Sequence, residues 1–291
     1  MPRSATYYAF TSIVLWSFLA YFGVKLSHLP PFLLVGIALC VCGLIGIVKL
    51  KEWRAPLKTY AVGIAGIFGY HFLYFNAFRY SPPVEVNLLN YLWPLLIVLL
   101  TPMYQRDHKL HSHHLIGAIL GLIGAGLIIS GGRISLNATH FLGYISAAGA
   151  AFVWANYSLM TKRLPPFPTS VVAGFCFFSG LLSLTCHFVL SPANEPLVYI
   201  RSVDWLHLLL LGAGPMGIAF FTWDASLKRG DPRIIGSLTY ITPLLSTLVL
   251  VFIGHQNLTP ITTIAMILII SGAVIGAWDL IRSPFMTTRS K

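Results

Sequence analysis

A histidine and several aromatic side chains share one helical face in an apolar stretch near residue 70. Imidazole both donates and accepts hydrogen bonds and changes charge near neutral pH, so this face can bind the polar end of a small ligand. The alternative is a histidine bonded to a neighbouring helix, and the sequence leaves both interpretations open. The residues recur at i, i+3, i+4 and i+7, with Tyr70 beside them: His71, Tyr74, Phe75 and Phe78.

A polar and aromatic segment, residues 87–94, precedes a wholly apolar run. Pro94 lacks a backbone donor and clashes with the turn before it, which frees the main-chain carbonyl of Asn90. A free carbonyl can accept a hydrogen bond from a ligand ammonium. Pro243 would do the same for Thr239 later in the chain. The competing explanation is a packing kink without a ligand, since Pro is common in transmembrane helices.

Further aromatic side chains are candidates for the same binding surface. An aromatic lining suits an apolar ligand side chain and holds an ammonium by cation–π contact. The competing account is the belt of Trp and Tyr at membrane interfaces, to which we assign the aromatic residues at the ends of the apolar runs. Trp223 is a further aromatic candidate, and Asp224 is a minor candidate. The expected binding set, with no catalytic residue, is His71, Tyr70, Tyr74, Asn90, Tyr91, Trp93, Pro94, Trp16, Trp154, Tyr157, Tyr240 and Pro243.

A histidine-rich segment and four cysteines are the remaining groups that could carry metal or redox chemistry. The histidines, at positions 108, 111, 113 and 114, lack a defined scaffold and an acidic partner in the sequence, so we expect a solvated loop rather than a metal site. The cysteines fall inside apolar runs, where Cys behaves as a small hydrophobic residue. We therefore expect no metal, no cofactor and no disulfide.

The composition excludes a soluble globular fold. Hydrophobic residues make up 56% of the 291 residues and charged residues only 9%, against roughly 25% in soluble proteins. The apolar runs are long enough to cross a bilayer as helices, and the loops between them are short. We predict an all-α integral membrane protein with ten spans: 7–24, 31–49, 59–79, 84–103, 114–130, 141–160, 169–190, 205–226, 234–253 and 261–281.

The positive charges predict the orientation. A net charge of +11 would suggest a nucleic-acid partner in a soluble protein, but here the loops alternate in charge. All 19 Lys and Arg residues except Lys25, Arg79, Arg133 and Arg201 fall on one side of the predicted membrane. The positive-inside rule therefore places both termini in the cytoplasm, and no nucleic-acid partner is expected.

The second half of the chain repeats the first. Residues 91–96 and 240–245 share the frame Tyr-x-x-Pro-Leu-Leu, and Trp16 corresponds to Trp154. Five spans are an odd number, so residues 136–291 would enter the membrane from the side opposite to residues 1–135. Inverted repeats of this kind are typical of transporters that work by alternating access.

Several motifs together resemble the drug/metabolite transporter superfamily, in its EamA-type branch. They are the paired Trp16 and Trp154, residues 76–80, residues 84–86 and the run Asn-Tyr-Leu-Trp-Pro at 90–94. Within that branch the last two are similar to the aromatic amino acid exporters of bacterial inner membranes. The resemblance covers nearly the whole chain and implies export of amino acids and related metabolites from the cytoplasm.

We therefore expect a bacterial inner-membrane exporter of aromatic and bulky neutral amino acids, of broad specificity and monomeric, with the amino acid and the lipid bilayer as its partners. The alternatives are export of other metabolites or cationic drugs, and transport of nucleotide sugars, which would need deep Lys or Arg clamps that the spans lack. An intramembrane hydrolase would need a nucleophile paired with a base, and no such pair is evident. A receptor is the other non-transport alternative.

For the coupling of transport, facilitated transport down the substrate gradient is favoured over proton antiport through His71.

Overall fold

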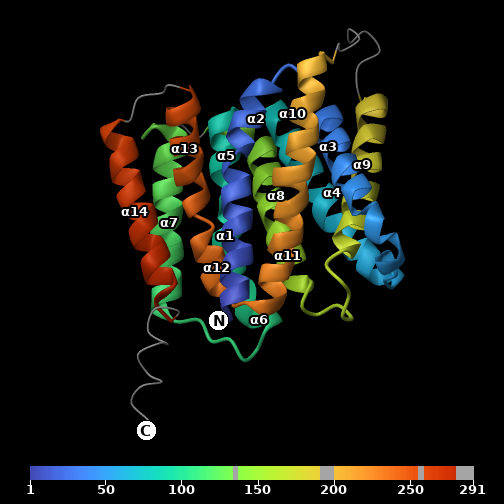
Figure 1. Ribbon diagram of the computed structural model, residues 1–291. Helices are drawn as coiled ribbons and strands as arrows, with labels where there is room; N and C mark the ends of the chain where they lie inside the picture. The colour runs from blue at the N-terminus through green and yellow to red at the C-terminus, as the bar shows by residue number, and fades with distance from the viewer. Residues whose placement is uncertain (134–136, 191–199, 255–258, 280–291) are drawn as a thin grey trace.

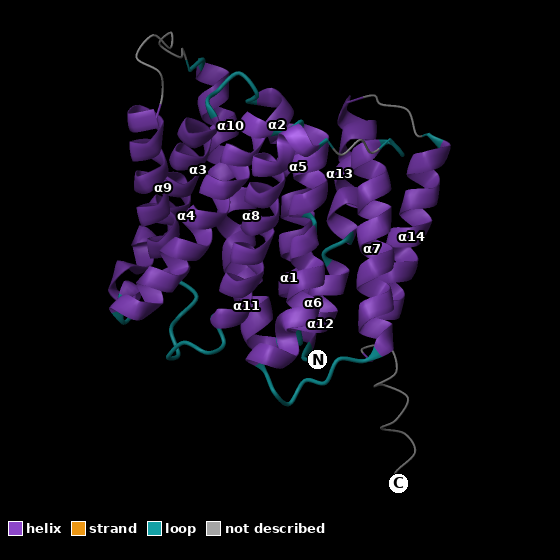
Figure 2. Ribbon diagram, turned by 180° about the vertical axis from the view of Figure 1, so that it is seen from behind, coloured by secondary structure: helices purple, strands orange, loops and turns teal. Residues whose placement is uncertain are grey.

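The structure, a computed structural model, describes residues 1–133, 137–190, 200–254 and 259–279. Within these ranges every regular element is a helix, and the helices stand side by side in one bundle (Figures 1 and 2). The elements are α1 (Arg3–Ser17), α2 (Leu19–Lys25), α3 (Pro31–Gly46), η1 (Ile47–Trp53), α4 (Leu57–Tyr80), α5 (Pro83–Asn90), α6 (Leu92–Tyr104), α7 (Ser112–Ser130), η2 (Ala138–His140), α8 (Phe141–Met160), α9 (Val171–Leu190), α10 (Ser202–Ala213), η3 (Gly214–Ile218), α11 (Ala219–Arg229), α12 (Pro232–Leu238), α13 (Ile241–Gly254) and α14 (Pro260–Gly276).

Seven helical segments in the described residues are long and apolar enough to cross a membrane. The chain is therefore a multi-pass membrane protein. The predicted spans at 141–160, 234–253 and 261–281 are largely helical but are not among the seven; α14, for example, has 17 residues. Ten spans thus stay a prediction. The seven are Arg3–Lys25, Pro31–Trp53, Leu57–Tyr80, Pro83–Tyr104, Ser112–Ser130, Val171–Leu190 and Ser202–Arg229.

Four long apolar segments are interrupted within their length. Breaks at Phe18 and Tyr91 separate α1 from α2 and α5 from α6, and a break at residues 239–240 separates α12 from α13. The π-helical turn η3 interrupts the segment formed by α10 and α11. Pro94 and Pro243 each follow a break by three residues, as expected of a ring that clashes with the preceding turn. Such irregular backbone is tolerated at membrane depth where it is buried in protein or lines a cavity.

Glycines allow close packing between helices. A methyl group on Gly117 of α7 would lie 2.4 Å from the backbone nitrogen of Gly276 in α14, so the two backbones touch. A methyl group on Gly66 of α4 would lie 2.4 Å from the ring of Tyr157 in α8. These contacts join helices of the two predicted halves.

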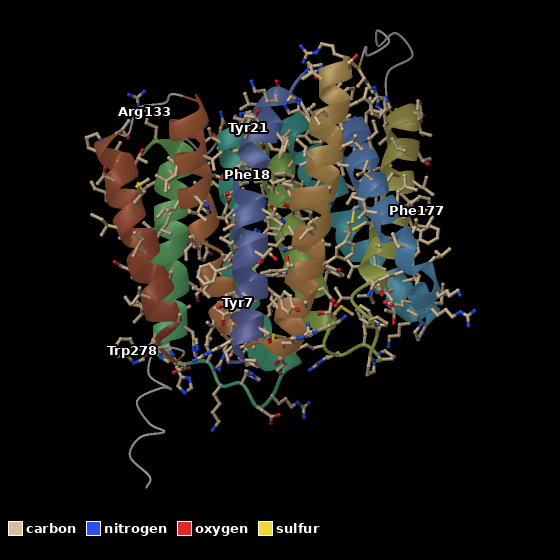
Figure 3. All side chains as sticks on the ribbon, viewed as in Figure 1. Tyr7, Phe18, Tyr21, Arg133, Phe177 and Trp278 are labelled. Carbon is tan, nitrogen blue, oxygen red and sulfur yellow. The ribbon has the colours of Figure 1, made fainter. Side chains whose placement is uncertain are left out.

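The first residue of α1 and the last turn of α14 lie at the same end of the bundle (Figure 1). We call this the terminal end and the opposite one the far end. Trp278 lies at the terminal end and Arg133 at the far end (Figure 3). Tyr7 and Trp278 are exposed, 74% and 48%, as expected of interfacial aromatic residues. The basic residues Arg282, Arg289 and Lys291, which contribute to the predicted orientation, lie outside the described residues.

Candidate functional site

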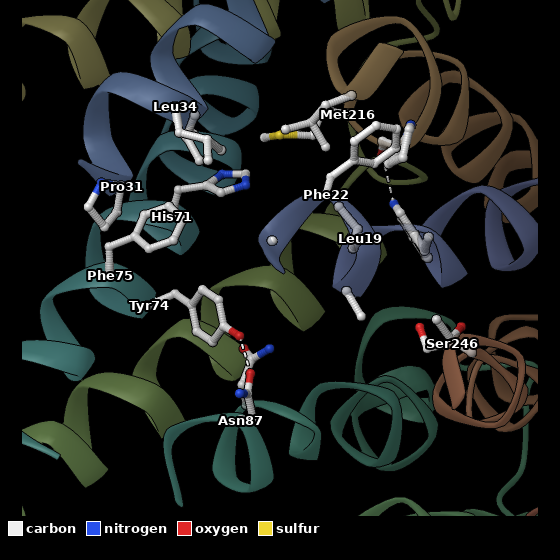
Figure 4. Close-up of a pocket in the computed structure, with 18 of the residues that line it drawn as sticks. Leu19, Phe22, Pro31, Leu34, His71, Tyr74, Phe75, Asn87, Met216 and Ser246 are labelled. Atoms are coloured by element: carbon white, nitrogen blue, oxygen red, sulfur yellow. Dashed lines mark hydrogen bonds between the residues drawn. The ribbon is translucent and has the colours of Figure 1, made fainter. Parts of the chain in front are cut away.

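A cavity of about 610 Å³ lies inside the bundle, with walls from both predicted halves (Figure 4). Its volume falls in the range of small-molecule sites. Pro94, Tyr157 and Tyr240 do not line it, whereas the other nine residues of the expected binding set do. Those nine are Trp16, Tyr70, His71, Tyr74, Asn90, Tyr91, Trp93, Trp154 and Pro243.

The cavity reaches the far end of the bundle. Its lining includes Gly23 and Ser27, which are exposed and lie at or beside the α2–α3 connection. Towards the terminal end it meets buried indoles: Trp16 and Trp93 are 7% and 8% exposed, and Trp223 behind them is 2% exposed. The cavity is therefore open towards one end and closed towards the other.

Four indole rings cluster at the closed end, where Trp16, Trp93 and Trp154 line the floor of the cavity and Trp223 packs behind them. They come from α1, α6, α8 and α11, and their centroids lie 5.1 to 6.4 Å apart, in edge-on and tilted contacts that favour the quadrupoles of the rings. Trp16 Nε1 donates to the carbonyl of Pro215 at 3.1 Å, and Trp223 Nε1 donates to Ser158 Oγ at 3.0 Å. The indole N–H groups of Trp93 and Trp154 donate to no group in the described part of the chain. They are free to donate to a ligand.

His71 presents an acceptor to the cavity. Its Nδ1 lies 2.7 Å from the carbonyl of Ile67, so Nδ1 must carry a proton and donate it. In the neutral ring Nε2 is then an acceptor. Figure 4 shows the imidazole pointing into the cavity. One nitrogen is thus bonded to the residue's own helix rather than to a neighbouring one, and the other faces the cavity, so a role of His71 in ligand binding stays a prediction.

A chain of polar side chains runs along the α4–α5 wall. Asn90 Nδ2 donates to the hydroxyl of Tyr70 at 3.2 Å, and the hydroxyl of Tyr74 donates to Asn87 Oδ1. Asn90 Oδ1 is buried and has no partner among the described residues. The same is true of Thr242 Oγ1 across the cavity. A buried unpaired oxygen is destabilising by about 1–3 kcal/mol, so both are places where a ligand donor would be favourable.

The cavity lining contains no Asp, Glu, Lys or Arg among the described residues. Asp224 is buried, but it is bonded to Lys228 at 2.7 Å and to Thr169 at 2.8 Å, outside the lining. Since an unpaired charge is costly in such a place, a net-neutral ligand fits best. The aromatic walls would hold an apolar body, and the free donors and acceptors would bind polar groups at one end of it.

Comparisons with known proteins show the family of the chain that forms this cavity. The model of the EamA-like transporter family matches residues 3–130 and again residues 141–277. The chain belongs to this family. Among relatives of this EamA-like chain, the aromatic amino acid exporter YddG of Ancylobacter novellus is 40% identical over 281 residues, which cover 94% of the chain and 96% of the relative.

More distant relatives carry related names. The aromatic amino acid exporter YddG of Escherichia coli is 26% identical over 196 residues, which are 65% of the EamA-like chain and 63% of the relative. The biotin transporter of the same species is 24% identical over 255 residues, 84% of the chain and 83% of the relative. One crystal structure matches with a TM-score of 0.90 and 39% identity, covering 97% of this chain and 99% of the other.

Tyr240 of the EamA-like chain holds the helix break at Tyr91 instead of lining the cavity. Its hydroxyl donates to the main-chain carbonyl of Tyr91 at 3.2 Å and accepts from the N–H of Leu95 at 3.1 Å. In a regular helix these two groups bond to each other, so the hydroxyl is inserted between them. The sequence predicts the main-chain carbonyl of Asn90 as a ligand acceptor here, which stays a prediction. The structure adds a second acceptor, the side-chain oxygen of Asn90, which has no partner among the described residues.

Replacing Tyr240 by Phe is expected to destabilise the protein by about 1–3 kcal/mol, because the carbonyl of Tyr91 and the N–H of Leu95 lose a buried partner. The measurement is unfolding in detergent, titrated with SDS and followed by circular dichroism. Tyr7→Phe, at a site 74% exposed, is the matched control and should leave the midpoint unchanged. Equal midpoints for Tyr240→Phe and the wild type would show that the bridge contributes nothing.

Polar contacts seal the terminal end of the EamA-like bundle. Lys162 Nζ donates to the carbonyl of Gly230 at 2.7 Å, and Arg163 donates to the carbonyl of Tyr104 at 2.8 Å. Burial lowers the pKa of Lys162, an effect that the nearby carboxylate of Asp231 partly offsets. These contacts tie the loop after α8 to the loops after α6 and α11.

The histidine segment differs from the prediction. His113 and His114 lie in the first turn of α7 rather than in a loop, and His114 is fully buried. Asp279, just after α14, supplies the acidic partner that is not evident in the sequence. The pairing was not predictable locally because more than 160 positions of the chain separate the two histidines from Asp279.

Proposed function

We propose that this protein exports aromatic and bulky neutral amino acids from the cytoplasm of a bacterium, across its inner membrane. The observation that carries the proposal is the relationship to the Ancylobacter novellus exporter, 40% identical over almost the full length of both chains. The cavity supports it, because its lining is aromatic and uncharged. An amino acid zwitterion has no net charge and needs no ionic clamp.

The proposed binding mode follows from the free groups. The ammonium donates to Asn90 Oδ1 and to His71 Nε2, two acceptors that have no partner among the residues that the structure describes. The carboxylate accepts from the indole N–H groups of Trp93 and Trp154. The side chain packs against the aromatic walls, where an aromatic pair adds about 0.5–1.5 kcal/mol beyond the burial of area.

The proposed architecture is ten spans in two inverted halves, residues 1–135 and 136–291, with both termini in the cytoplasm. The two matches to the family model, one in each half, support this division. The equivalent breaks at Tyr91 and at residues 239–240, each followed by a proline three residues on, support it too. Inverted halves can exchange conformations around a central site, which is the basis of alternating access.

With that orientation, the described conformation is the outward-facing one. The cavity is lined at the far end by exposed residues, and the terminal end is sealed by Lys162 and Arg163. In the proposed cycle these contacts break to admit the substrate from the cytoplasm and re-form before release. We propose that the cycle is facilitative, because the described residues that line the cavity include no carboxylate to carry a proton.

Counterflow in proteoliposomes without any ion gradient tests the proposal. Vesicles loaded with unlabelled phenylalanine should take up labelled phenylalanine and methionine, and they should take up threonine more weakly. Empty liposomes are the control. Uptake of a labelled nucleotide sugar but of none of the three amino acids would overturn the proposal in favour of a phosphate-bearing substrate. Uptake that requires an imposed pH gradient would overturn the facilitative cycle alone.

Asn90→Leu should remove the preference for substrates that carry an ammonium. The wild type is expected to prefer phenylalanine over 3-phenylpropionate by at least about 100-fold, since sites built around buried polar groups strongly reject analogues that lack the partner. The variant should prefer phenylalanine by less than about tenfold, because each unit of 1.4 kcal/mol is worth a factor of ten. Inhibition constants in counterflow measure both. Asn156→Leu, outside the cavity lining, is the control; an unchanged preference in Asn90→Leu would exclude the proposed role.

A further inference from the structure

Three histidines and one aspartate converge at the terminal end, away from the cavity. His111, His113 and His114 begin α7, and Asp279 follows α14. One ligand atom of each lies within 4.8 Å of all the others. We propose that this group, the terminal-end histidine site, binds one transition-metal ion of the Zn²⁺, Ni²⁺ and Cu²⁺ class.

Burial without a hydrogen-bond partner is the observation that points to a ligand. His114 is 0% exposed, and its Nε2 makes no hydrogen bond to any described residue. The same holds for Nε2 of His113. Both atoms lie 3.3 Å from the same oxygen of Asp279, in a geometry that satisfies neither. A cation among the three would satisfy all of them, as buried polar groups require.

The distances fit a metal of small radius. With bonds of about 2.0–2.2 Å to His nitrogen and carboxylate oxygen, the donor atoms of a tetrahedral site lie roughly 3.4 Å apart. The two separations of 3.3 Å to Asp279 already match. The exposed ring of His111 caps the start of α7 by accepting from the backbone N–H of His114, and a rotation of this ring on metal binding would shorten the wider separations. The exposed His111 and the Asp279 carboxylate, 44% exposed, give the ion a route from water.

The donor set selects the class of ion. Imidazole suits Zn²⁺, Cu²⁺ and Ni²⁺, whereas Mg²⁺ and Ca²⁺ prefer oxygen ligands. Arg233, a positive charge that acts on His114, is bonded to Asp231 at 2.6 Å and is thereby compensated. The backbone N–H of His111 donates to Nδ1 of His114 at 3.3 Å, which is a long hydrogen bond. When Nε2 of His114 binds the ion, the proton of the neutral imidazole moves to Nδ1, and this hydrogen bond is lost.

An ion here would fasten α7 to α14 at their terminal ends. The same two helices already touch through Gly117 and Gly276, a short distance along the bundle. The site shares no residue with the cavity, so metal binding and amino acid transport are separable in experiment.

The test uses the full chain in detergent, carrying a purification tag without histidines and stripped with EDTA. Equilibrium dialysis against Zn²⁺, with the metal counted by mass spectrometry, is expected to give one ion per chain at micromolar free Zn²⁺, and none when Mg²⁺ replaces Zn²⁺. Asp279→Asn and His113→Ala should each weaken binding by at least about 100-fold, since even the loss of an outer-shell partner costs 10–100-fold. His207→Ala, on α10, should bind as the wild type does.

A visible spectrum of the Co²⁺ form provides a second readout, because tetrahedral nitrogen and oxygen coordination gives stronger absorption than six-coordinate hydrated Co²⁺. Size-exclusion chromatography shows which variants are folded, and Asp279→Asn preserves shape if His113→Ala does not fold. A wild type that binds no Zn²⁺, or variants that bind Zn²⁺ as tightly as the wild type does, would overturn the site.

Discussion

Trp93→Ala should reduce the affinity for phenylalanine by at least about 100-fold. Trp93 lies at the floor of the cavity, from which its indole can offer both an aromatic surface and a free N–H donor. About half of an indole, roughly 100 Å², would contact the substrate, and at about 25 cal/mol per Å² this contributes about 2.5 kcal/mol. The lost hydrogen bond to a charged carboxylate adds about 1.5 kcal/mol or more. Each 1.4 kcal/mol is tenfold in affinity.

The measurement is the concentration dependence of phenylalanine counterflow. Trp93→Phe separates the two contributions, because it keeps a ring and loses the donor, and the expected fall in affinity is about tenfold. Trp223→Ala controls for packing: it damages the same cluster, with ring centroids 5.6 Å from Trp93, but does not line the cavity. If Trp223→Ala lowers affinity as much as Trp93→Ala while both remain folded, the indole of Trp93 does not contact the substrate.

Gly117→Ala should destabilise the protein by about 3 kcal/mol. Its methyl group would lie 2.4 Å from the backbone nitrogen of Gly276 and 2.6 Å from the carbonyl oxygen of Gly272. These are backbone atoms and cannot turn aside as a flexible side chain would, so α7 and α14 must separate along their contact. Overpacking of this kind costs about 1–3 kcal/mol or more, and here the attractive contact of two helices is lost with it.

Gly126→Ala is the matched control, being the same substitution on the same helix. Its methyl group would meet only a side-chain carbon of Leu88, at an ordinary distance of 3.4 Å. Because Ala is favoured over Gly in a helix by roughly 0.5–1 kcal/mol, this variant should be as stable as the wild type or slightly more stable. SDS-titrated unfolding followed by circular dichroism compares the two. Equal unfolding midpoints for Gly117→Ala and Gly126→Ala would show that the close contact of α7 with α14 does not contribute to stability.

Much of the candidate site could be anticipated from the sequence, because polar and aromatic residues inside apolar runs are costly unless they face the bundle interior. His71 and Tyr74 follow a helical period, and Asn90 stands within an otherwise apolar span, so their place on the cavity wall is a local property. Tyr240 was not predictable in this way. Its hydroxyl acts on the backbone of Tyr91, 149 positions away, and only the fold brings the two together.

In the fold, too, the features that depend on neighbouring residues could be predicted, whereas contacts between residues far apart in the sequence could not. Seven spans have enough length and hydropathy to be recognised one by one. The sequence also predicts a span at 234–253, and the kink expected from Pro243 corresponds to the break between α12 and α13, which have 7 and 14 residues. The grouping of His113 and His114 with Asp279 was missed because histidines at the start of one helix and an aspartate after the end of a distant helix carry no signal of proximity.

The π-helical turn Gly214–Ile218 determines which residues of its span face the cavity. Because each residue turns a helix by about 100°, one extra residue in a turn rotates everything after it by that amount. The cavity lining on this span accordingly passes from Leu211 and Pro215 to Met216 and Phe220. The turn contains one residue more than a regular α-helical turn, and one codon of the gene encodes that residue. An in-frame deletion of that codon would replace the side chains that form one wall of the cavity. In descendants of this gene, the range of substrates can therefore change by deletion of a residue as well as by substitution.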